Sequence, residues 1–496
     1  MCAPSACARH RPAALLRRRA KRAGTPHEEA VAEPAVELNR RRVLVVGLAR
    51  SGLAAARFLR RRGAIVCATD QAPAERLGPA VAELEALGVR LELGGHREAS
   101  FTSADLVVVS PGVPLSLAPL AAARRRGVPV IGELELAFRF VAAPILAVTG
   151  TNGKTTVTEL AGAMLSASGR KVFIGGNIGT PLIAYADAAA PAEVLVVEVS
   201  SFQLDGCETF RPRVGVLLNL TADHLDRYPD FAAYAASKMR LFRRQGPEDA
   251  AVLNADDPEI ARRAGEVAAR RLFFSRRLPP GEVEASIGPE AIAVRLPGGP
   301  AAEIPLADFR APGAHNRENA AAAALAALSC GATLEGVRRG LAAYRPGAHR
   351  LERVAVVEGV TFINDSKATN VDAVRRGLES LEGPVVLLMG GIDKGGDFGA
   401  LGEALESRVR EVLLLGGQER IRRALAGKVP VREVASMREA VEEAFARSPA
   451  GGTVLLAPGC ASFDRYADYR ERGEDFRREV LRLAGRRPER PPGSRR

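Results

Sequence analysis

ILAVTGTNGKTT, residues 145–156, is a short apolar run followed directly by a glycine-containing loop and a helical pattern. Its glycines let backbone N–H groups approach a phosphate, and Lys154 supplies positive charge. The hydroxyl of Thr155 can reach a Mg²⁺ ion, while a helix beginning at this point adds its dipole. The full Walker spacing is absent because its first glycine position holds Val148. We predict a strand, a phosphate-binding loop and a helix, in preference to a glycine turn with a surface lysine.

Apolar runs on both sides of this stretch alternate with helical patterns, which is typical of βαβ units around parallel sheets. Proline or glycine interrupts the pattern near 141–144 and 345–348. A chain of 496 residues is long enough for about three domains. We therefore predict a three-domain α/β fold, with a Rossmann-like nucleotide-binding domain over 41–141, a central P-loop ATPase-like domain over 142–346 and a Rossmann-like C-terminal domain over 347–485.

Composition and charge exclude several classes of protein. The 47% hydrophobic content excludes a mainly disordered chain, and no apolar run approaches the roughly 18 residues that span a bilayer. Residues 1–23 carry +7 and residues 486–496 carry +4, so 12 − 7 − 4 leaves +1 for residues 24–485. We expect disordered basic tails over 1–40 and 486–496, with no nucleic-acid partner. No secretory signal is recognised, and the six cysteines contain no CxxC pair, which favours reduced thiols.

A second glycine-containing loop lies near the start of the predicted first domain. Residues 47–52 (GLARSG) resemble GxGxxG with alanine at the middle glycine, and Asp70 follows 18 residues after Gly52. This pattern indicates a dinucleotide-type βα turn, and the replaced glycine disfavours an intact nicotinamide site. A turn that binds nothing is the alternative.

Polar residues follow two strands next to the phosphate loop. Glu198 closes the apolar run 194–197, and a carboxylate there is costly unless it meets a cation. Asn219, Thr221, Asp223 and His224 occupy the equivalent exit of the next run. Because ligands collect at the carboxyl ends of parallel strands, we favour a metal-ligand role for Glu198 and His224 over surface or packing roles.

Lys238 is an unusual residue on its predicted helix. It shares an apolar stripe with Phe231, Tyr234 and Leu241, where an ammonium ion is rare. A lysine whose charged end reaches water is the simpler explanation. The more specific explanation is a neutralised amine that reacts with CO₂ to form a carbamate. The carbamate would be an anionic metal ligand.

Several motifs together resemble the Mur ligase family. They are the loop TGTNGKTT (149–156), GNIG (176–179), EVSSFQL (198–204), DHLDR (223–227), NADD (254–257), GAHN (313–316) and HR (349–350). Within that family, NDSKATN (364–370), MGG (389–391) and DK (393–394) resemble the members that add D-glutamate to UDP-N-acetylmuramoyl-L-alanine. The matches cover about residues 41–485 in unbroken order.

This resemblance implies ATP-dependent amide formation in cytoplasmic peptidoglycan precursor synthesis. The carboxylate of UDP-N-acetylmuramoyl-L-alanine would be phosphorylated to an acyl phosphate, which the amine of D-glutamate would attack. It implies ATP, two Mg²⁺ ions and a CO₂-derived carbamate on Lys238, which makes the carbamate our preferred interpretation of that residue. We expect a monomer with small-molecule substrates and no nucleic-acid or membrane partner.

The resemblance also implies a role for individual residues. The catalytic residues would be Lys154, His224, Lys238 and Lys367, and the metal ligands would be Thr155, Glu198, His224 and carbamylated Lys238. ATP would contact Gly150, Thr151, Asn152, Gly153, Lys154, Thr155, Thr156, Asn316, Asn319, Arg350 and Asp365. The UDP-substrate would contact Gly47, Arg50, Ser51, Gly52, Asp70, Ser110, Pro111, Gly112 and Asn177. D-Glutamate would contact Thr369, Lys394, Ser462, Phe463 and Tyr469, the last at a position where the family commonly has phenylalanine.

Three alternatives stay open at this point. Another amide ligase of the same fold would use a different amino acid, which a substrate panel distinguishes. A nicotinamide-dependent oxidoreductase built on the first domain would bind NAD, against which Ala49 argues. A non-catalytic nucleotide-binding or tail-mediated interaction protein would not need Lys154, Glu198, His224 and Lys238 together.

Overall fold

The computed structural model describes residues 37–187, 191–416 and 418–486. The predicted tails over 1–36 and 487–496 lie outside the described residues. Residues 37–40 are described, and they belong to the fold: Leu38 is buried, and the Arg40 N–H donates to the Gly63 carbonyl over 2.9 Å. The N-terminal tail boundary predicted at residue 40 is therefore too late.

The first sheet is a five-stranded parallel sheet in the order β3-β2-β1-β4-β5. Its central strands β1 and β4 are almost wholly buried, as expected where helices cover a parallel sheet on both faces. The strands are β1 (Arg42–Val46), β2 (Ile65–Asp70), β3 (Arg90–Leu93), β4 (Leu106–Val109) and β5 (Val130–Gly132). The helices are α1 (Arg50–Arg61), α2 (Ala74–Leu77), α3 (Pro79–Ala86), α4 (Glu98–Thr102), α5 (Ala118–Arg125) and α6 (Glu133–Phe138).

The second sheet has nine strands in the order β14-β13-β12-β11-β10-β9-β6-β8-β7, and only its β13 and β14 end is antiparallel. The strands are β6 (Ile145–Thr149), β7 (Val172–Gly176), β8 (Val194–Glu198), β9 (Val214–Leu217), β10 (Ala250–Asn254), β11 (Arg270–Ser275), β12 (Ala285–Ile287), β13 (Ala291–Val294) and β14 (Ala302–Pro305).

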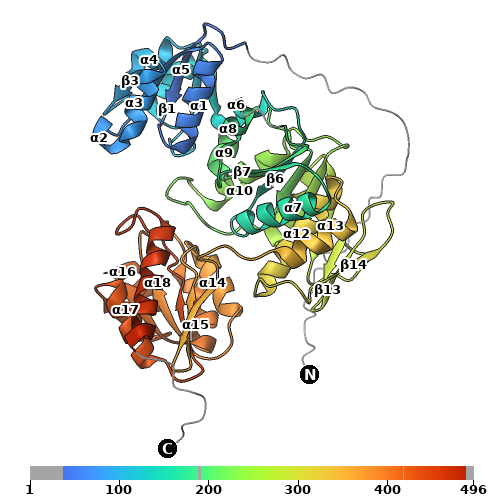
Figure 1. Cartoon of the computed structure of the whole chain (residues 1–496), viewed down its shortest axis with the longest axis vertical. Helices are drawn as coiled ribbons and strands as arrows, with labels where there is room; N and C mark the ends of the chain where they lie inside the picture. The colour runs from blue at the N-terminus through green and yellow to red at the C-terminus, as the bar shows by residue number, and fades with distance from the viewer. Residues whose placement is uncertain (1–36, 188–190, 417, 487–496) are drawn as a thin grey trace, which may run out of the picture. The chain divides into compact units, whose positions relative to one another are not determined.

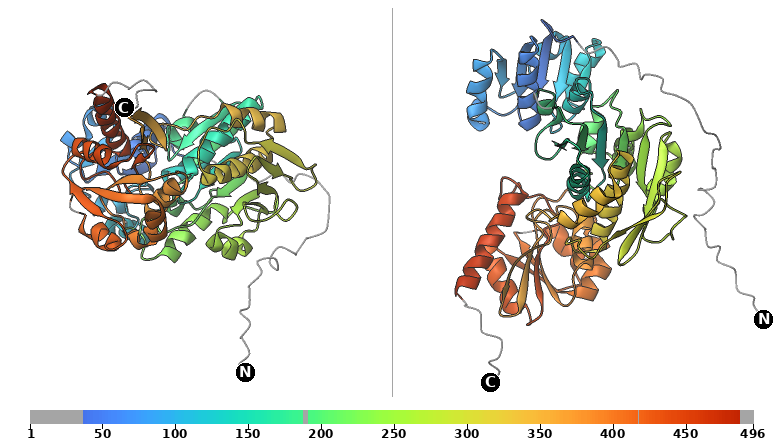
Figure 2. Two further views of the ribbon diagram at one scale, coloured as in Figure 1. Left: turned by 90° about the horizontal axis from the view of Figure 1, so that it is seen from below. Right: turned by 45° about the vertical axis from the view of Figure 1, so that its right-hand side comes forward.

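Helices α7 (Lys154–Ala167) and α12 (Ala314–Ser329) lie against this second sheet, and α13 (Leu334–Ala343) packs on α7 (Figures 1 and 2). Residues 320–327 of α12 are all buried, because this alanine-rich helix sits between the sheet and its neighbours. The remaining helical segments are α8 (Leu182–Ala186), α9 (Ser201–Asp205), α10 (Phe231–Met239), η2 (Arg240–Phe242), α11 (Pro258–Arg263) and η3 (Ala264–Glu266).

The third sheet has the order β15-β16-β20-β17-β18-β19 and is parallel except for β15. One apolar cluster on it includes α14 and α15, and a second includes α17 and α18, so helices cover both faces. The strands are β15 (Glu352–Val357), β16 (Val360–Asn364), β17 (Val385–Met389), β18 (Val409–Leu415), β19 (Val431–Val434) and β20 (Thr453–Leu456). The helical segments are α14 (Val371–Glu379), η4 (Phe398–Leu401), α15 (Gly402–Arg408), α16 (Glu419–Leu425), α17 (Met437–Arg447) and α18 (Tyr469–Arg486).

The strand order positions the functional residues. In the second sheet β6 and β9 are neighbours, and the chain leaves β6 toward β7 but leaves β9 toward β10, in opposite directions along the sheet. The carboxyl end at such a switch point is where open α/β sheets bind ligands. In the third sheet β20 lies between β16 and β17, which brings the loops after these three strands together. Among the described residues, no helix is long and apolar enough to cross a membrane.

Candidate active site

The loop between β6 and α7 has the geometry of a phosphate-binding loop. Gly150 and Gly153 have φ angles of +148° and +85°, and a Cβ on Gly153 would lie 2.4 Å from the amide oxygen of Asn319. A side chain at either position would therefore strain the loop or clash. The 14-residue helix α7 begins at Lys154, so its N-terminal N–H groups and dipole face this loop.

Two lysines reach the same carbonyl group of this loop. The Nζ atoms of Lys154 and Lys238 donate to the Gly150 oxygen over 3.0 and 2.9 Å, and Lys154 also donates to Thr151. Lys238 is only 2% exposed, as its place on an apolar stripe predicts. Burial lowers the pKa of Lys238 well below its ordinary value, and the neighbouring Lys154 lowers it further. Burial lowers the pKa of Lys154 as well.

Glu198 closes β8 next to the phosphate loop. Its Oε2 accepts a hydrogen bond from the Thr155 hydroxyl over 2.6 Å, and its Oε1 accepts one from the Asn177 amide over 2.7 Å. The carboxylate is 2% exposed. A buried carboxylate and a hydroxyl beside a phosphate loop are the hard oxygen donors that Mg²⁺ prefers.

His224 follows β9 with a backbone φ of +58°, an uncommon conformation for a residue other than glycine. Burial lowers its pKa to about 4, so its imidazole is neutral at pH 7 and can bind a metal. The carboxylate of Asp223 lies 3.7 Å from its Nε2 atom. Among residues 37–187, 191–416 and 418–486 there is no cluster of three or more His, Cys, Asp or Glu side chains arranged around a metal position.

The loops of the third sheet contribute the other half of the site. The Nζ of Lys367, after β16, lies 4.0 Å from the centre of the Tyr469 ring. Burial, together with the smaller effect of the nearby Arg350, lowers the pKa of Lys367 to about 8. Burial raises the pKa of Asp365 to about 7. The Nζ of Lys394, after β17, donates to Asp223 over 2.7 Å.

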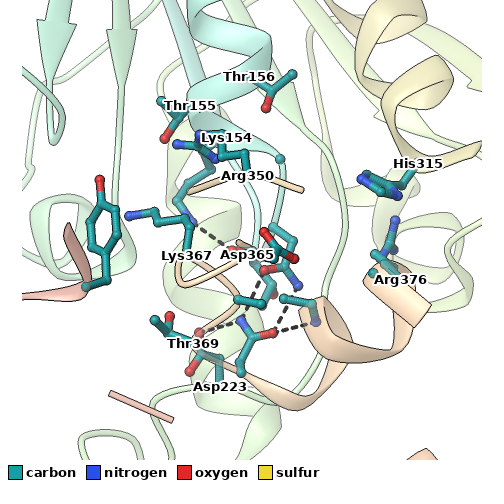
Figure 3. A pocket seen from close by; sticks show the side chains of 18 of the residues that line it. Lys154, Thr155, Thr156, Asp223, His315, Arg350, Asp365, Lys367, Thr369 and Arg376 are labelled. Carbon is teal, nitrogen blue, oxygen red and sulfur yellow. Dashed lines mark hydrogen bonds between the residues drawn. The ribbon is translucent and has the colours of Figure 1, made fainter. Parts of the chain in front are cut away.

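These two halves line one cavity of about 520 Å³. Figure 3 shows Lys154 and Thr155 around this space together with Asp365 and Lys367. The sequence-predicted residues that line it are Thr151, Asn152, Gly153, Lys154, Thr155, Thr156, Asn177, Glu198, His224, Asn316, Asn319, Arg350, Asp365, Lys367, Thr369, Lys394, Ser462, Phe463 and Tyr469. Gly150, which is part of the loop, and Lys238, which donates to its carbonyl, are not in the lining.

The predicted UDP-substrate residues of the first sheet are outside this lining. The Asp70 carboxylate accepts hydrogen bonds from the Leu48 and Ala72 N–H groups over 2.6 and 2.8 Å, which ties two loops together. The Ser110 hydroxyl donates to the Gly47 carbonyl over 2.7 Å. A Cβ on Gly52 would lie 1.8 Å from that same carbonyl oxygen, so glycine is required there. Arg50 reaches across to the Asn177 carbonyl over 3.4 Å.

Arg472 is a buried residue that the sequence does not single out. Its guanidinium donates to the Ser366 hydroxyl and carbonyl and to the carbonyls of Gly390 and Cys460, over 2.9 to 3.4 Å. It therefore holds together the three loops that follow β16, β17 and β20. Arg472 lies in an arginine-rich helix, so its charge pattern gives no signal, and only its position three residues after Tyr469 could have drawn attention to it.

Comparison with known proteins identifies the family of this chain. Three family models match the chain in order: the MurD-like N-terminal domain over residues 41–132, the Mur ligase middle domain over 148–327 and the Mur ligase glutamate ligase domain over 349–460. The chain belongs to the Mur ligase family. The three-domain α/β fold predicted from the sequence is thereby confirmed.

Curated relatives give the same family, and a solved structure shares the fold. A UDP-N-acetylmuramoylalanine--D-glutamate ligase of Desulfosudis oleivorans is 51% identical over 90% of this chain and 98% of its own length. The protein of the same name from Desulfatibacillum aliphaticivorans is 47% identical over 90% of this chain and 100% of its own. The MurF ligase of Thermotoga maritima, solved in complex with ADP, has a TM-score of 0.58 at 17% identity and covers 90% of this chain and 100% of its own. That last similarity concerns the fold alone.

Proposed function

We propose that this chain is an ATP-dependent ligase that joins D-glutamate to the L-alanyl carboxylate of UDP-N-acetylmuramoyl-L-alanine, with ADP and phosphate as the other products. The observation that carries the proposal is the single cavity in which a phosphate-binding loop meets cationic residues from the third sheet. The relatives at 51% and 47% identity, which align over almost their whole lengths, support this choice of substrates.

The cationic side chains suit amide formation through an acyl phosphate. A carboxylate is a poor electrophile, and its phosphorylation provides a leaving group. Because the nucleotide phosphates and both carboxylate substrates are anionic, positive charge must bring them together. Lys154 would hold the terminal phosphates of ATP, and Lys367 would stabilise the charge of the transferred group. Asn316, Asn319, Arg350 and Asp365 would hold the rest of the nucleotide.

Thr155 and Glu198 would hold a Mg²⁺ ion beside these phosphates. Their oxygen atoms are 2.6 Å apart at the mouth of the phosphate loop, and both are donor types that suit the ion. Mg²⁺ supplies charge stabilisation to a transferring phosphoryl group when it is bound.

For Lys238 we propose a carbamate that, together with His224, holds a second Mg²⁺ ion. An ammonium at this position would repel the ion, so the unmodified side chain does not fit the role. The lowered pKa of Lys238 increases the fraction of free amine, which is the form that reacts with CO₂. The new carboxylate-like group would relieve the charge repulsion between Lys238 and Lys154.

The first sheet would bind the uridine diphosphate through the loop 47–52 and through Asp70. Asn177 would contact the muramoyl-peptide portion. It already spans the two regions, because its amide donates to Glu198 and its carbonyl accepts from Arg50. D-Glutamate would be bound by Thr369, Lys394, Ser462, Phe463 and Tyr469. The ammonium of Lys394, which is paired with Asp223, would then also contact a carboxylate of D-glutamate.

Phosphate release from the purified chain tests this function. With UDP-N-acetylmuramoyl-L-alanine, ATP and Mg²⁺, release should require D-glutamate and should fail with L-glutamate. Equal rates with L-alanine or a diamino acid would overturn the choice of amino acid and leave the family unchanged. Absence of release with every amino acid would overturn the ligase proposal.

We further propose a cytoplasmic monomer that acts on small molecules, without a nucleic-acid partner. Residues 24–485 carry a net charge of only +1, so electrostatic attraction to a polyanion such as a nucleic acid would be weak. Light scattering coupled to size-exclusion chromatography should give a mass close to 52.5 kDa. A mass of twice that value would contradict the monomer.

A further inference from the structure

The side chain of Asn152, within the phosphate loop, makes all its hydrogen bonds with residues at the start of α14, which follows β16 of the third sheet. Its amide nitrogen donates to Asn370 over 3.3 Å and to Asp372 over 2.9 Å, and its oxygen accepts from Asn370 over 3.1 Å. The backbone of Asn152 is held separately, through hydrogen bonds with Asn219. The side chain therefore makes no hydrogen bond within the loop itself.

Asn370 makes every hydrogen bond that an asparagine amide can make. Its two N–H groups donate to Asn152 and, over 3.1 Å, to the Asp223 carboxylate. Its oxygen accepts from Asn152 and, over 2.9 Å, from the Ala373 N–H at the start of α14. Asn370 is 8% exposed. An aspartate cannot donate, and a serine is too short to reach both partners, so only an amide fits all four contacts.

Asp223 extends these contacts to a second loop of the third sheet. One of its oxygens accepts from Asn370 and the other from Lys394. The buried carboxylate, 8% exposed, thus meets two donors from two different loops. The dashed lines beside Asp223 in Figure 3 mark hydrogen bonds of this group.

We propose that Asn370 is a positioning residue that fixes the register between the phosphate loop and the loops carrying Lys367 and Lys394, through its simultaneous contacts with Asn152 and Asp223. This inference rests on the proposed ligase function, because the register matters where a phosphate donor on one side must meet an acceptor and an amine on the other. The reacting atoms need to approach within about 3–3.5 Å, and a displacement of about 1 Å can cost roughly 100-fold in rate.

Two substitutions separate this role from helix capping, because Asn370 also caps α14. Serine, aspartate and asparagine cap helices about equally well. Asn370→Ser therefore keeps the cap and loses the contacts with Asn152 and Asp223. Asn370→Asp keeps the cap as well, but it loses both donors and faces the Asp223 carboxylate with a like charge. Ser436→Ala is the matched control, since it removes a side-chain cap from α17 outside the cavity lining.

The experiment measures kcat and KM by phosphate release, and the urea midpoint, for these variants and the wild type. We expect kcat to fall about 30-fold in Asn370→Ser, equivalent to about 2 kcal/mol, and further in Asn370→Asp. We expect the KM for ATP to change less than kcat, and Ser436→Ala to keep wild-type kcat. A kcat within twofold of wild type in both Asn370 variants would overturn the proposal, since capping alone would then explain the residue.

A double-mutant cycle with Asn152→Ala tests the contact itself. If the two side chains act through each other, Asn152→Ala combined with Asn370→Ser should lose no more kcat, and no more urea stability, than the worse single variant. Losses that multiply in kcat and add in stability would overturn the proposed register. If the wild-type chain releases no phosphate with D-glutamate, the proposed function is overturned instead. The double-mutant cycle measured by urea unfolding would still decide whether the contact exists.

Discussion

Lys154 and Lys238 place two amines on one carbonyl oxygen of the phosphate loop, and their separate roles can be tested by substitution. Lys154→Ala should abolish turnover, because the phosphate-binding loop would lose its lysine cation. Binding of the UDP-substrate, measured by calorimetry, should stay largely intact, since the residues proposed to contact uridine belong to the first sheet. An equal loss of UDP-substrate binding would show that the two sites are not separate.

Lys238→Ala should be nearly inactive if the carbamate is a metal ligand. A short carboxylic acid in the medium should restore part of the activity by occupying the vacated space, whereas bicarbonate should not, because no amine remains to react. Lys238→Arg is the matched control: it keeps a positive charge and cannot form this carbamate. Activity of Lys238→Arg equal to wild type would contradict the carbamate.

Residues differ in how far their role could be predicted from the sequence. Lys238 could be flagged because a lysine on an apolar helical stripe is unusual, and its burial follows from that pattern. The reciprocal amide contacts of Asn152 and Asn370 could not, because the two residues are 218 positions apart and only the strand order brings them together. The role of Arg472 could not be predicted either, because its partners on the loops after β16 and β17 are distant in sequence and because other arginines surround it in the sequence.

Helix α6 has six residues, and two of them are buried glutamates that form hydrogen bonds outside the helix. The Glu133 carboxylate accepts one hydrogen bond, from the Ile183 N–H over 2.9 Å, and its second oxygen has no partner. Glu135 accepts from the N–H groups of residues 208–210. Both glutamates thus connect the end of the first sheet to loops and helices of the second.

Glu133 should make stability depend on pH. Burial raises its pKa from 4.5 to about 7, so between these values the folded state keeps a proton that the unfolded chain has lost. The free energy of unfolding should therefore fall as pH rises from 4.5 to 7, by on the order of 3 kcal/mol at most. Glu133→Gln does not titrate, so its urea midpoint relative to wild type should rise between pH 5 and pH 8. A constant difference across this range would contradict the buried carboxyl.

Long parallel strands were the elements most open to prediction. The runs 145–149 and 385–389 match β6 and β17, because a strand covered on both faces is apolar along its whole length. The short strands β3 and β14, at sheet edges, and β13, beside β14, were not predicted. Each has only four residues, and neither the alternation in β3 nor the apolar run in β13 is long enough to distinguish a strand from a loop.

For the whole molecule, the charge distribution predicts that the tails are dispensable. Removal of 1–36 and 487–496 should leave activity within a few-fold of the full chain. The N-terminal cut is placed before residue 37, because a cut after residue 38 would remove the buried Leu38. A loss of 100-fold or more, about 2.7 kcal/mol of transition-state stabilisation, would show that a tail takes part in catalysis.

The ring of Tyr469 stands against Lys367 in a protein whose sequence has six tyrosines and no tryptophan. Tyrosine emission is therefore not masked by indole fluorescence anywhere in the chain. Tyr469→Trp would place a single indole in the cavity, with the Lys367 ammonium as its neighbour. The wavelength of its emission maximum would shift when water or that ammonium is displaced, so ligand binding could be followed by fluorescence in real time.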